Sequence, residues 1–94
     1  MNSDENLQLL AKSILKIRNK QEAVNYFKDL FSNKELETLI LRLRIAKMLY
    51  EGTSYVEIER ETGASSATIA KISEAIKYGH EGLSTILERM KRAR

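Results

Sequence analysis

The chain has 94 residues, 43% apolar and 31% charged, which suits one small folded domain over residues 1–94 and excludes a disordered segment. It has no cysteine, so disulfides and thiolate metal sites are excluded, and its longest apolar run is far short of a membrane span. The net charge of +3 is compatible with nucleic acid without requiring it, and no leader sequence opens the chain, so we expect a cytoplasmic protein.

The composition predicts an all-α fold, because proline is absent and Leu, Ile, Ala, Lys, Arg and Glu dominate. Apolar residues at helical spacing predict a first helix from about Ser3 to Ile17. Two capping signatures predict the starts of the second and third helices: Asn19 with Glu22, and Ser32 with Glu35. The third helix is expected over Asn33 to Glu51.

The third helix is apolar on two sides. Its two predicted stripes are Leu36, Leu39, Ile40 and Leu43, and Leu41, Ile45, Met48 and Leu49. A domain of this size can hardly surround such a helix, so we expect a homodimer in which the helices before Gly52 exchange contacts between chains. A compact monomeric bundle is the alternative.

A helix-turn-helix is predicted over about residues 54–77. Ser54 with Glu57 forms a capping signature, and Gly63 suits the left-handed end of a helix. Ser65 or Ser66 then caps a second helix. The crossing of the two helices is expected to depend on a small apolar cluster of Ile58, Ile69 and Ile72. In this motif the second helix enters the major groove of DNA.

A short hinge, residues 78–82, and an amphipathic helix carrying Leu83, Ile86, Leu87 and Met90 complete a predicted order of six helices. Catalysis has little support, since His80 is the only histidine and lies in the hinge. We therefore predict no catalytic residue, no metal site and no cofactor.

With these helices placed, the chain resembles the tryptophan repressor family over about residues 31–90. The resemblance is carried by Arg42-Leu43-Arg44-Ile45, Leu49-Tyr50-Glu51-Gly52, Glu57-Ile58, Gly63-Ala64 and Ala67-Thr68-Ile69. The sequence is more similar still to a TrpR-related branch found in bacteria outside the classical repressor group. The resemblance implies a six-helix, intertwined homodimer that binds double-stranded operator DNA and regulates transcription.

The resemblance implies that the start of the recognition helix touches bases and phosphates, and that a lysine near its end reaches a phosphate. The matching positions are Ser66, Ala67, Thr68, Ala70 and Lys77. The residues themselves add Ser65, as a further hydroxyl, and Lys71, which shares an outer face with Thr68. Ordinary helix capping explains Ser65 or Ser66 equally well, and small outward residues also fit a plain surface helix.

The family holds tryptophan between two arginines, and here the matching positions are Arg42 and Lys71. A family glycine beside the second arginine is Ile72, and a family serine near the ligand amine is Ala75. Lysine does not reproduce the stacking of a guanidinium on an indole, and Ile72 occupies space near the ring. We expect that tryptophan does not bind, and the sequence names no other effector.

The first helix of the helix-turn-helix is acidic, with Glu57, Glu59 and Glu61 against Arg60. Charge for DNA phosphates must therefore come from Arg42, Arg44, Lys71, Lys77 and the basic tail, although Arg42 and Arg44 are equally explained as solvated charges or partners of Glu37. A second hypothesis is an adaptor of the same fold that docks its acidic helix on a basic protein and does not bind DNA specifically.

Overall fold

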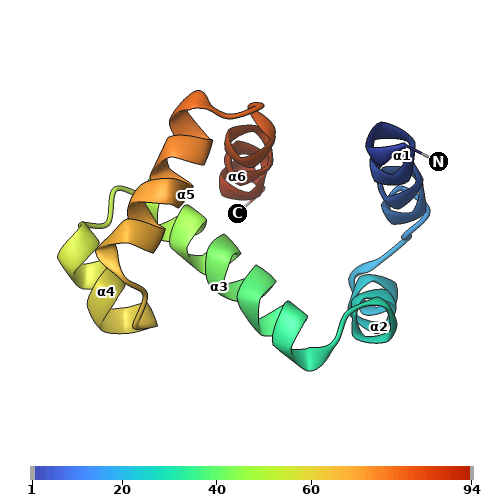
Figure 1. The fold of residues 1–94 in the computed structure, drawn as a ribbon, viewed down its shortest axis with the longest axis horizontal. Coiled ribbons are helices and arrows are strands. Elements are labelled where there is room, and N and C mark those ends of the chain that lie inside the picture. Colours follow the sequence, from blue (N-terminus) through green and yellow to red (C-terminus); the bar gives the residue numbers. More distant parts are fainter. Residues whose placement is uncertain (1, 94) are drawn as a thin grey trace. The chain divides into compact units, whose positions relative to one another are not determined.

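A computed structural model describes residues 2–93, and these form six α-helices, as predicted (Figure 1). The helices are α1 (Ser3–Ile14), α2 (Lys20–Leu30), α3 (Asn33–Tyr50), α4 (Tyr55–Thr62), α5 (Ser66–Tyr78) and α6 (Gly82–Arg92). Contacts between residues divide the chain into two compact units, and the boundary along the chain lies within α3, between Leu36 and Glu37. None of the described helices combines the length and apolar character needed to cross a membrane.

Helix α1 begins as expected but ends at Ile14, so the predicted end at Ile17 is wrong. The Lys16 and Ile17 amides donate to carbonyls only three residues back, which tightens the chain into turns after Ile14. In the same unit, the Tyr26 hydroxyl of α2 donates to Ser13 Oγ of α1 at 2.6 Å. This bond ties the two helices together.

The capping signatures before α2 and α3 are confirmed. Asn19 Oδ1 accepts from the Glu22 amide at 2.9 Å, which starts α2. Ser32 and Glu35 form a reciprocal capping box, with Glu35 N–H to Ser32 Oγ at 3.2 Å and Ser32 N–H to Glu35 Oε1 at 2.8 Å. The hydrogen bond from the Ser32 amide, followed by the interaction with the Ser32 hydroxyl, favours the charged carboxylate and lowers the pKa of Glu35.

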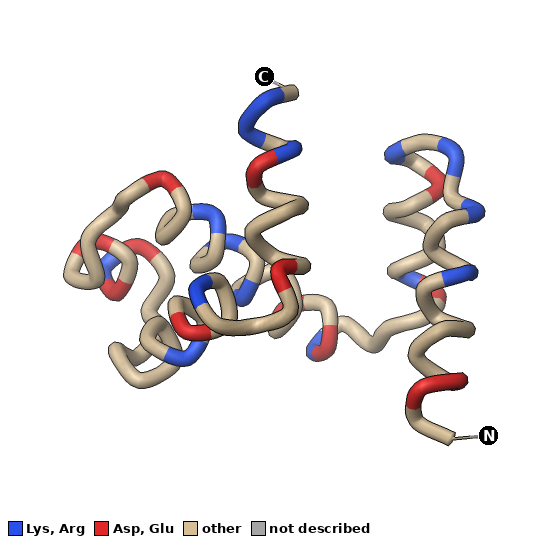
Figure 2. Tube along the Cα trace, turned by 90° about the horizontal axis from the view of Figure 1, so that it is seen from above, with Lys and Arg blue, Asp and Glu red and all other residues tan. Residues whose placement is uncertain are grey.

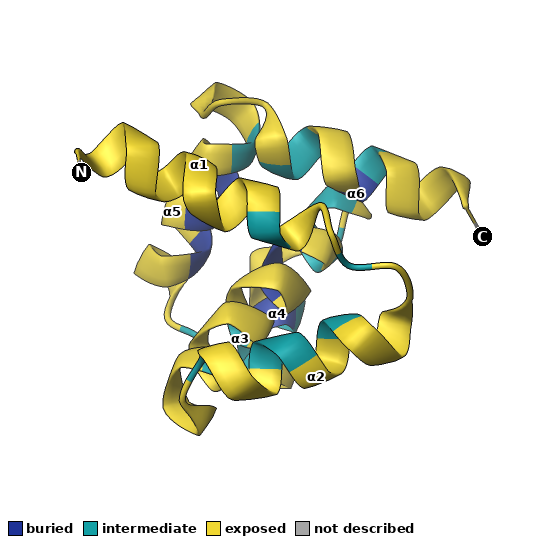
Figure 3. Cartoon of the chain, turned by 90° about the vertical axis from the view of Figure 1, so that its right-hand side faces the viewer, coloured by how far each residue is buried: buried dark blue, intermediate teal, exposed yellow. Residues whose placement is uncertain are grey.

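The core lies in the second unit and uses one of the two apolar stripes of α3. Ile45 and Ala46 are fully buried there, and they pack with Ile58, Ile69, Ile72 and Leu87 (Figure 3). Leu39, Ile40 and Leu43 of the other stripe remain 46%, 56% and 44% exposed. A single chain therefore leaves one apolar stripe of α3 exposed, and the dimer that was expected to cover it stays a prediction.

The helix-turn-helix is formed by α4 and α5. The Glu57 amide donates to Ser54 Oγ at 3.3 Å at the start of α4, and Gly63 ends the helix with φ of 74°. Side chains other than glycine strain this left-handed conformation. Ile58 and Ile69 are fully buried and Ile72 is nearly so, which confirms the expected packing between the helices.

Helix α6 is held against the end of α3 by a hydrogen bond as well as by apolar packing. The Tyr50 hydroxyl donates to Glu88 Oε2 at 2.5 Å, and this bond raises the pKa of Tyr50 because ionisation would break it. Leu87, the residue directly before Glu88 in α6, is buried in the core. The end of α3, which leads into the helix-turn-helix, is thus fixed from the C-terminal side of the chain.

Candidate nucleic-acid interface

The N-terminus of α5 is built by a pair of hydroxyl side chains. The Thr68 amide donates to Ser65 Oγ at 3.2 Å, so Ser65 is the cap and Ser66 is the first residue of the helix. The Ser65 hydroxyl in turn donates to Thr68 Oγ1 at 3.1 Å. Thr68 therefore belongs to the cap, which the sequence did not suggest, and its own hydroxyl proton stays free to donate to a phosphate or base acceptor.

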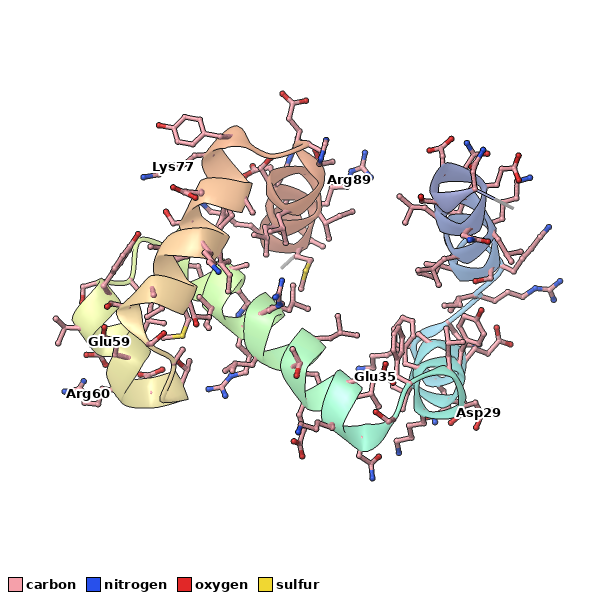
Figure 4. The ribbon with its side chains drawn as sticks, in the orientation of Figure 1. Asp29, Glu35, Glu59, Arg60, Lys77 and Arg89 are labelled. Atoms are coloured by element: carbon pink, nitrogen blue, oxygen red, sulfur yellow. The ribbon has the colours of Figure 1, made fainter. Side chains whose placement is uncertain are left out.

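Helix α5 has a buried face and an exposed face. Ile69, Ile72 and Ser73 are buried against the rest of the second unit. The residues predicted to contact DNA are all exposed: Ser65, Ser66, Ala67, Thr68, Ala70, Lys71 and Lys77. In Figure 4 the labelled Lys77 side chain extends outward from the C-terminal half of α5. The prediction for these seven residues is compatible with their exposure, and their contacts with DNA stay a prediction.

A pocket of about 410 Å³ opens where α3, α5 and α6 meet. It brings together all four residues that the sequence assigned to a ligand site, namely Arg42, Lys71, Ile72 and Ala75. Thr68 also lines it, so the face that carries Thr68, Lys71 and Ala75 is turned toward α3. The sequence did not predict the walls formed by Leu39, Leu43 and Leu83; the apolar stripe of α3 was the available signal for the first two.

Ile72 has two roles in this pocket. Its side chain lines the cavity and also belongs to the hydrophobic core, with only 7% of its surface exposed. The volume that it occupies beside Lys71 cannot be cleared by a simple rotation, because the core holds the side chain in place. The pocket therefore differs from one with a glycine at this position.

The charges of the second unit are unevenly distributed over its helices (Figure 2). The ion pairs seen within residues 2–93 join Lys47 to Glu51 and Arg60 to Glu57. Neither ion pair involves Arg42 or Arg44. Pairing of Arg42 or Arg44 with Glu37 is not observed among these described residues. The last turn of α6 adds a basic group formed by Arg89, Lys91 and Arg92. Helices α3, α5 and α6 thus each carry a net positive charge, while α4 carries a net negative charge.

His80 is exposed directly after α5, and no three His, Cys, Asp or Glu side chains between residues 2 and 93 are grouped closely enough to hold a metal ion.

The fold defines the class of protein. It is an all-α protein with a helix-turn-helix, whose second helix, α5, has an exposed face. The Trp repressor protein family matches residues 5–91, and the chain belongs to this family. The resemblance inferred from the sequence is thereby confirmed. The family consists of regulators and not of enzymes, and in general these are dimers that bind DNA.

Among its relatives is the uncharacterized protein YerC of Bacillus subtilis, 40% identical over 85 residues, or 90% of this chain and 82% of YerC. A candidate Trp repressor from Staphylococcus aureus has a crystal structure with a TM-score of 0.83 and 37% identity, covering 93% of this chain and 87% of that one. A TrpR-like protein from Eubacterium eligens also has a TM-score of 0.83, with 33% identity over 93% of this chain and 90% of that one.

Proposed function

We propose that the chain is a homodimeric transcription regulator of repressor type, which binds specific double-stranded DNA through α4 and α5 and does not respond to tryptophan. The observation that carries the proposal is the division of α5 into a buried apolar face and an exposed face of small and polar residues. Ile69 and Ile72 anchor one face in the core, while small and hydroxyl-bearing residues are exposed at its N-terminal end. Such a helix can approach base edges closely without bulky side chains in between.

Modest DNA affinity is expected from the charge distribution. The cations near the reading surface are few, and the acidic residues of α4 oppose phosphate contacts. Two-fold symmetry doubles the number of cations and predicts operator half-sites spaced by about one helical turn of DNA. With few direct base contacts available, DNA shape is expected to contribute to specificity.

Replacing Lys71 by alanine is expected to weaken binding to all DNA sequences. Loss of one phosphate contact in each protomer reduces the slope of log K against log salt by about 0.9 per contact, so by about 2 for the dimer. Thr68→Ala, in contrast, is expected to weaken binding to the selected operator about tenfold while nonspecific binding changes little. Fluorescence anisotropy with an operator chosen from a random DNA pool measures both effects.

The matched control for these variants is Lys28→Ala, which removes an exposed lysine from α2, outside the helix-turn-helix. It is expected to leave the operator affinity within about twofold of wild type, since the removed charge makes no phosphate contact. Unchanged DNA binding by both Lys71→Ala and Thr68→Ala would contradict the assignment of α5 as the recognition helix.

Titration of the protein with L-tryptophan is expected to give no saturable heat at micromolar concentration. Lys71 supplies an ammonium where stacking on an indole needs a flat guanidinium, and the buried Ile72 fills space in the pocket. Isothermal titration calorimetry at several protein concentrations makes this measurement. A dissociation constant in the micromolar range would contradict the proposed loss of tryptophan control.

A second candidate function is the adaptor that docks on a basic protein, and the surface of α4 favours it. Glu57 and Glu59 lie close in sequence to Val56, which is 75% exposed, so α4 presents an apolar side chain beside acidic ones. The two functions separate in a gel-shift assay with genomic DNA fragments at low salt. A shift that weakens with salt supports the DNA-binding regulator, and no shift at low salt supports the adaptor.

A further inference from the structure

A second cavity, of about 350 Å³, shares no residue with the pocket that contains Arg42 and Lys71. It lies between the end of α3, the turn that leads into α4, and the C-terminal half of α5. Its volume is in the range of cavities that bind small molecules. Neither the sequence nor the proposed contact with DNA accounts for it.

Ser73 of α5 gives this cavity an unusual polar wall. Only 8% of its surface is exposed, and it is the buried polar residue among those that the structure describes. Among the described residues no side-chain polar atom is both shielded from solvent and without a partner, so the Ser73 hydroxyl, which makes no hydrogen bond within residues 2–93, is open to solvent through the cavity that it lines. A molecule bound in the cavity can therefore replace solvent there and accept a hydrogen bond from this hydroxyl.

The other residues around the cavity indicate what kind of small molecule would bind in it. Thr53 offers a second hydroxyl, Lys77 offers a positive charge, and no carboxylate lines the cavity. Leu49, Ile76 and the ring of Tyr50 provide apolar walls. A ligand with an anionic head and a compact apolar body matches this distribution, because charged acceptors form the stronger hydrogen bonds and the walls favour hydrocarbon.

We infer that the cavity between α3, α4 and α5 is a binding site for a small carboxylic acid with an apolar side chain, whose carboxylate is held by Ser73, Thr53 and Lys77. A DNA phosphate is not the ligand of Ser73, because a duplex cannot follow a hydroxyl into a site where so little of the residue is exposed. A bound acid contacts both the turn after α3 and helix α5, and so joins the recognition helix to the long helix of the fold.

The site is tested without DNA, so its failure is separate from any failure of the proposed regulator function. Two simple acids serve as probes, phenylacetate with an aromatic body and 3-methylbutanoate with a branched aliphatic one. Titration followed by ¹H–¹⁵N NMR is expected to give saturable shifts of the Thr53, Ser73 and Lys77 amides with at least one probe. Phenylacetamide, which has the same body as phenylacetate without its charge, is expected to bind at least about tenfold more weakly.

Ser73→Ala removes the hydroxyl that faces the cavity but keeps a good helix former, and it is expected to weaken binding of the better probe about tenfold, as for the loss of one hydrogen bond to a charged group. Arg42→Ala, in the other pocket, is the matched control and leaves the affinity for the probe unchanged. Circular dichroism establishes that both variants are folded. Absence of saturable shifts up to about 10 mM of either acid, or equal affinity of wild type and Ser73→Ala, would overturn the assignment, as would shifts confined to the pocket of Arg42 and Lys71.

Discussion

Replacement of Ile40 by aspartate is expected to dissociate the proposed dimer, with a loss of at least about a hundredfold in the association constant. Ile40 is 56% exposed in the single chain although it lies in the middle of the long helix α3. A partner that covers this stripe would also cover the new carboxylate, and an unpaired buried charge costs several kcal/mol. Sedimentation equilibrium over a range of protein concentrations measures the change.

Val56→Asp is the matched control, since Val56 is 75% exposed in the first turn of α4, where a carboxylate suits the helix dipole. It is expected to leave the dimer intact. For a dimeric wild type, the melting temperature is also expected to rise with protein concentration, because association stabilises the folded chain. A wild-type protein that is monomeric at about 100 μM, with a constant melting temperature, would rule out the dimer.

Replacement of Ile69 by alanine is expected to lower the free energy of unfolding by about 2–5 kcal/mol, the cost of truncating a large side chain in a well-packed core. Ile69 is fully buried and joins α5 to Ile45 and Ile58. A loss of this size is a large part of the stability of a small domain. Urea unfolding at fixed protein concentration measures it as a lower midpoint with an unchanged slope.

The expected effect on DNA binding goes beyond stability. Ile69 follows Thr68 directly and holds the start of α5 in the core, so its truncation loosens the part of the helix that is proposed to read bases. Val56→Ala, on the exposed side of α4, is the control and is expected to change the free energy of unfolding by no more than about 0.5 kcal/mol. An Ile69→Ala loss below about 1 kcal/mol would contradict the central place of Ile69 in the core.

The helix starts were predictable because their determinants are local. Asn19, Ser32 and Ser54 each accept a hydrogen bond from an amide three residues later, within a single turn of chain. The end of α1 was not predictable from spacing alone, since apolar residues continue at helical intervals to Ile17 while the backbone tightens after Ile14. Apolar periodicity reports which side of a helix is buried and is less informative about where the hydrogen-bond ladder stops.

The candidate sites depended on different information. The four ligand residues Arg42, Lys71, Ile72 and Ala75 came from family resemblance, and the structure gathers all of them around one pocket. Leu83 enters that pocket from α6, and no local pattern could indicate it, because its position depends on the path of the chain after α5. Ser73 could not be singled out either, since a serine in a helix is usually at the surface.

The sequence by itself determined the all-α class, the six helices, the capping residues and the isoleucines that fix the crossing of α4 and α5. These features follow from hydrogen bonds and apolar spacing over a few residues. Only the tertiary structure decided which stripe of α3 enters the core, and that Ser73 lies in a cavity with Thr53 and Lys77. The reason is physical: these outcomes depend on the angles at which helices far apart in the chain cross, and those angles are set by all the packed side chains together.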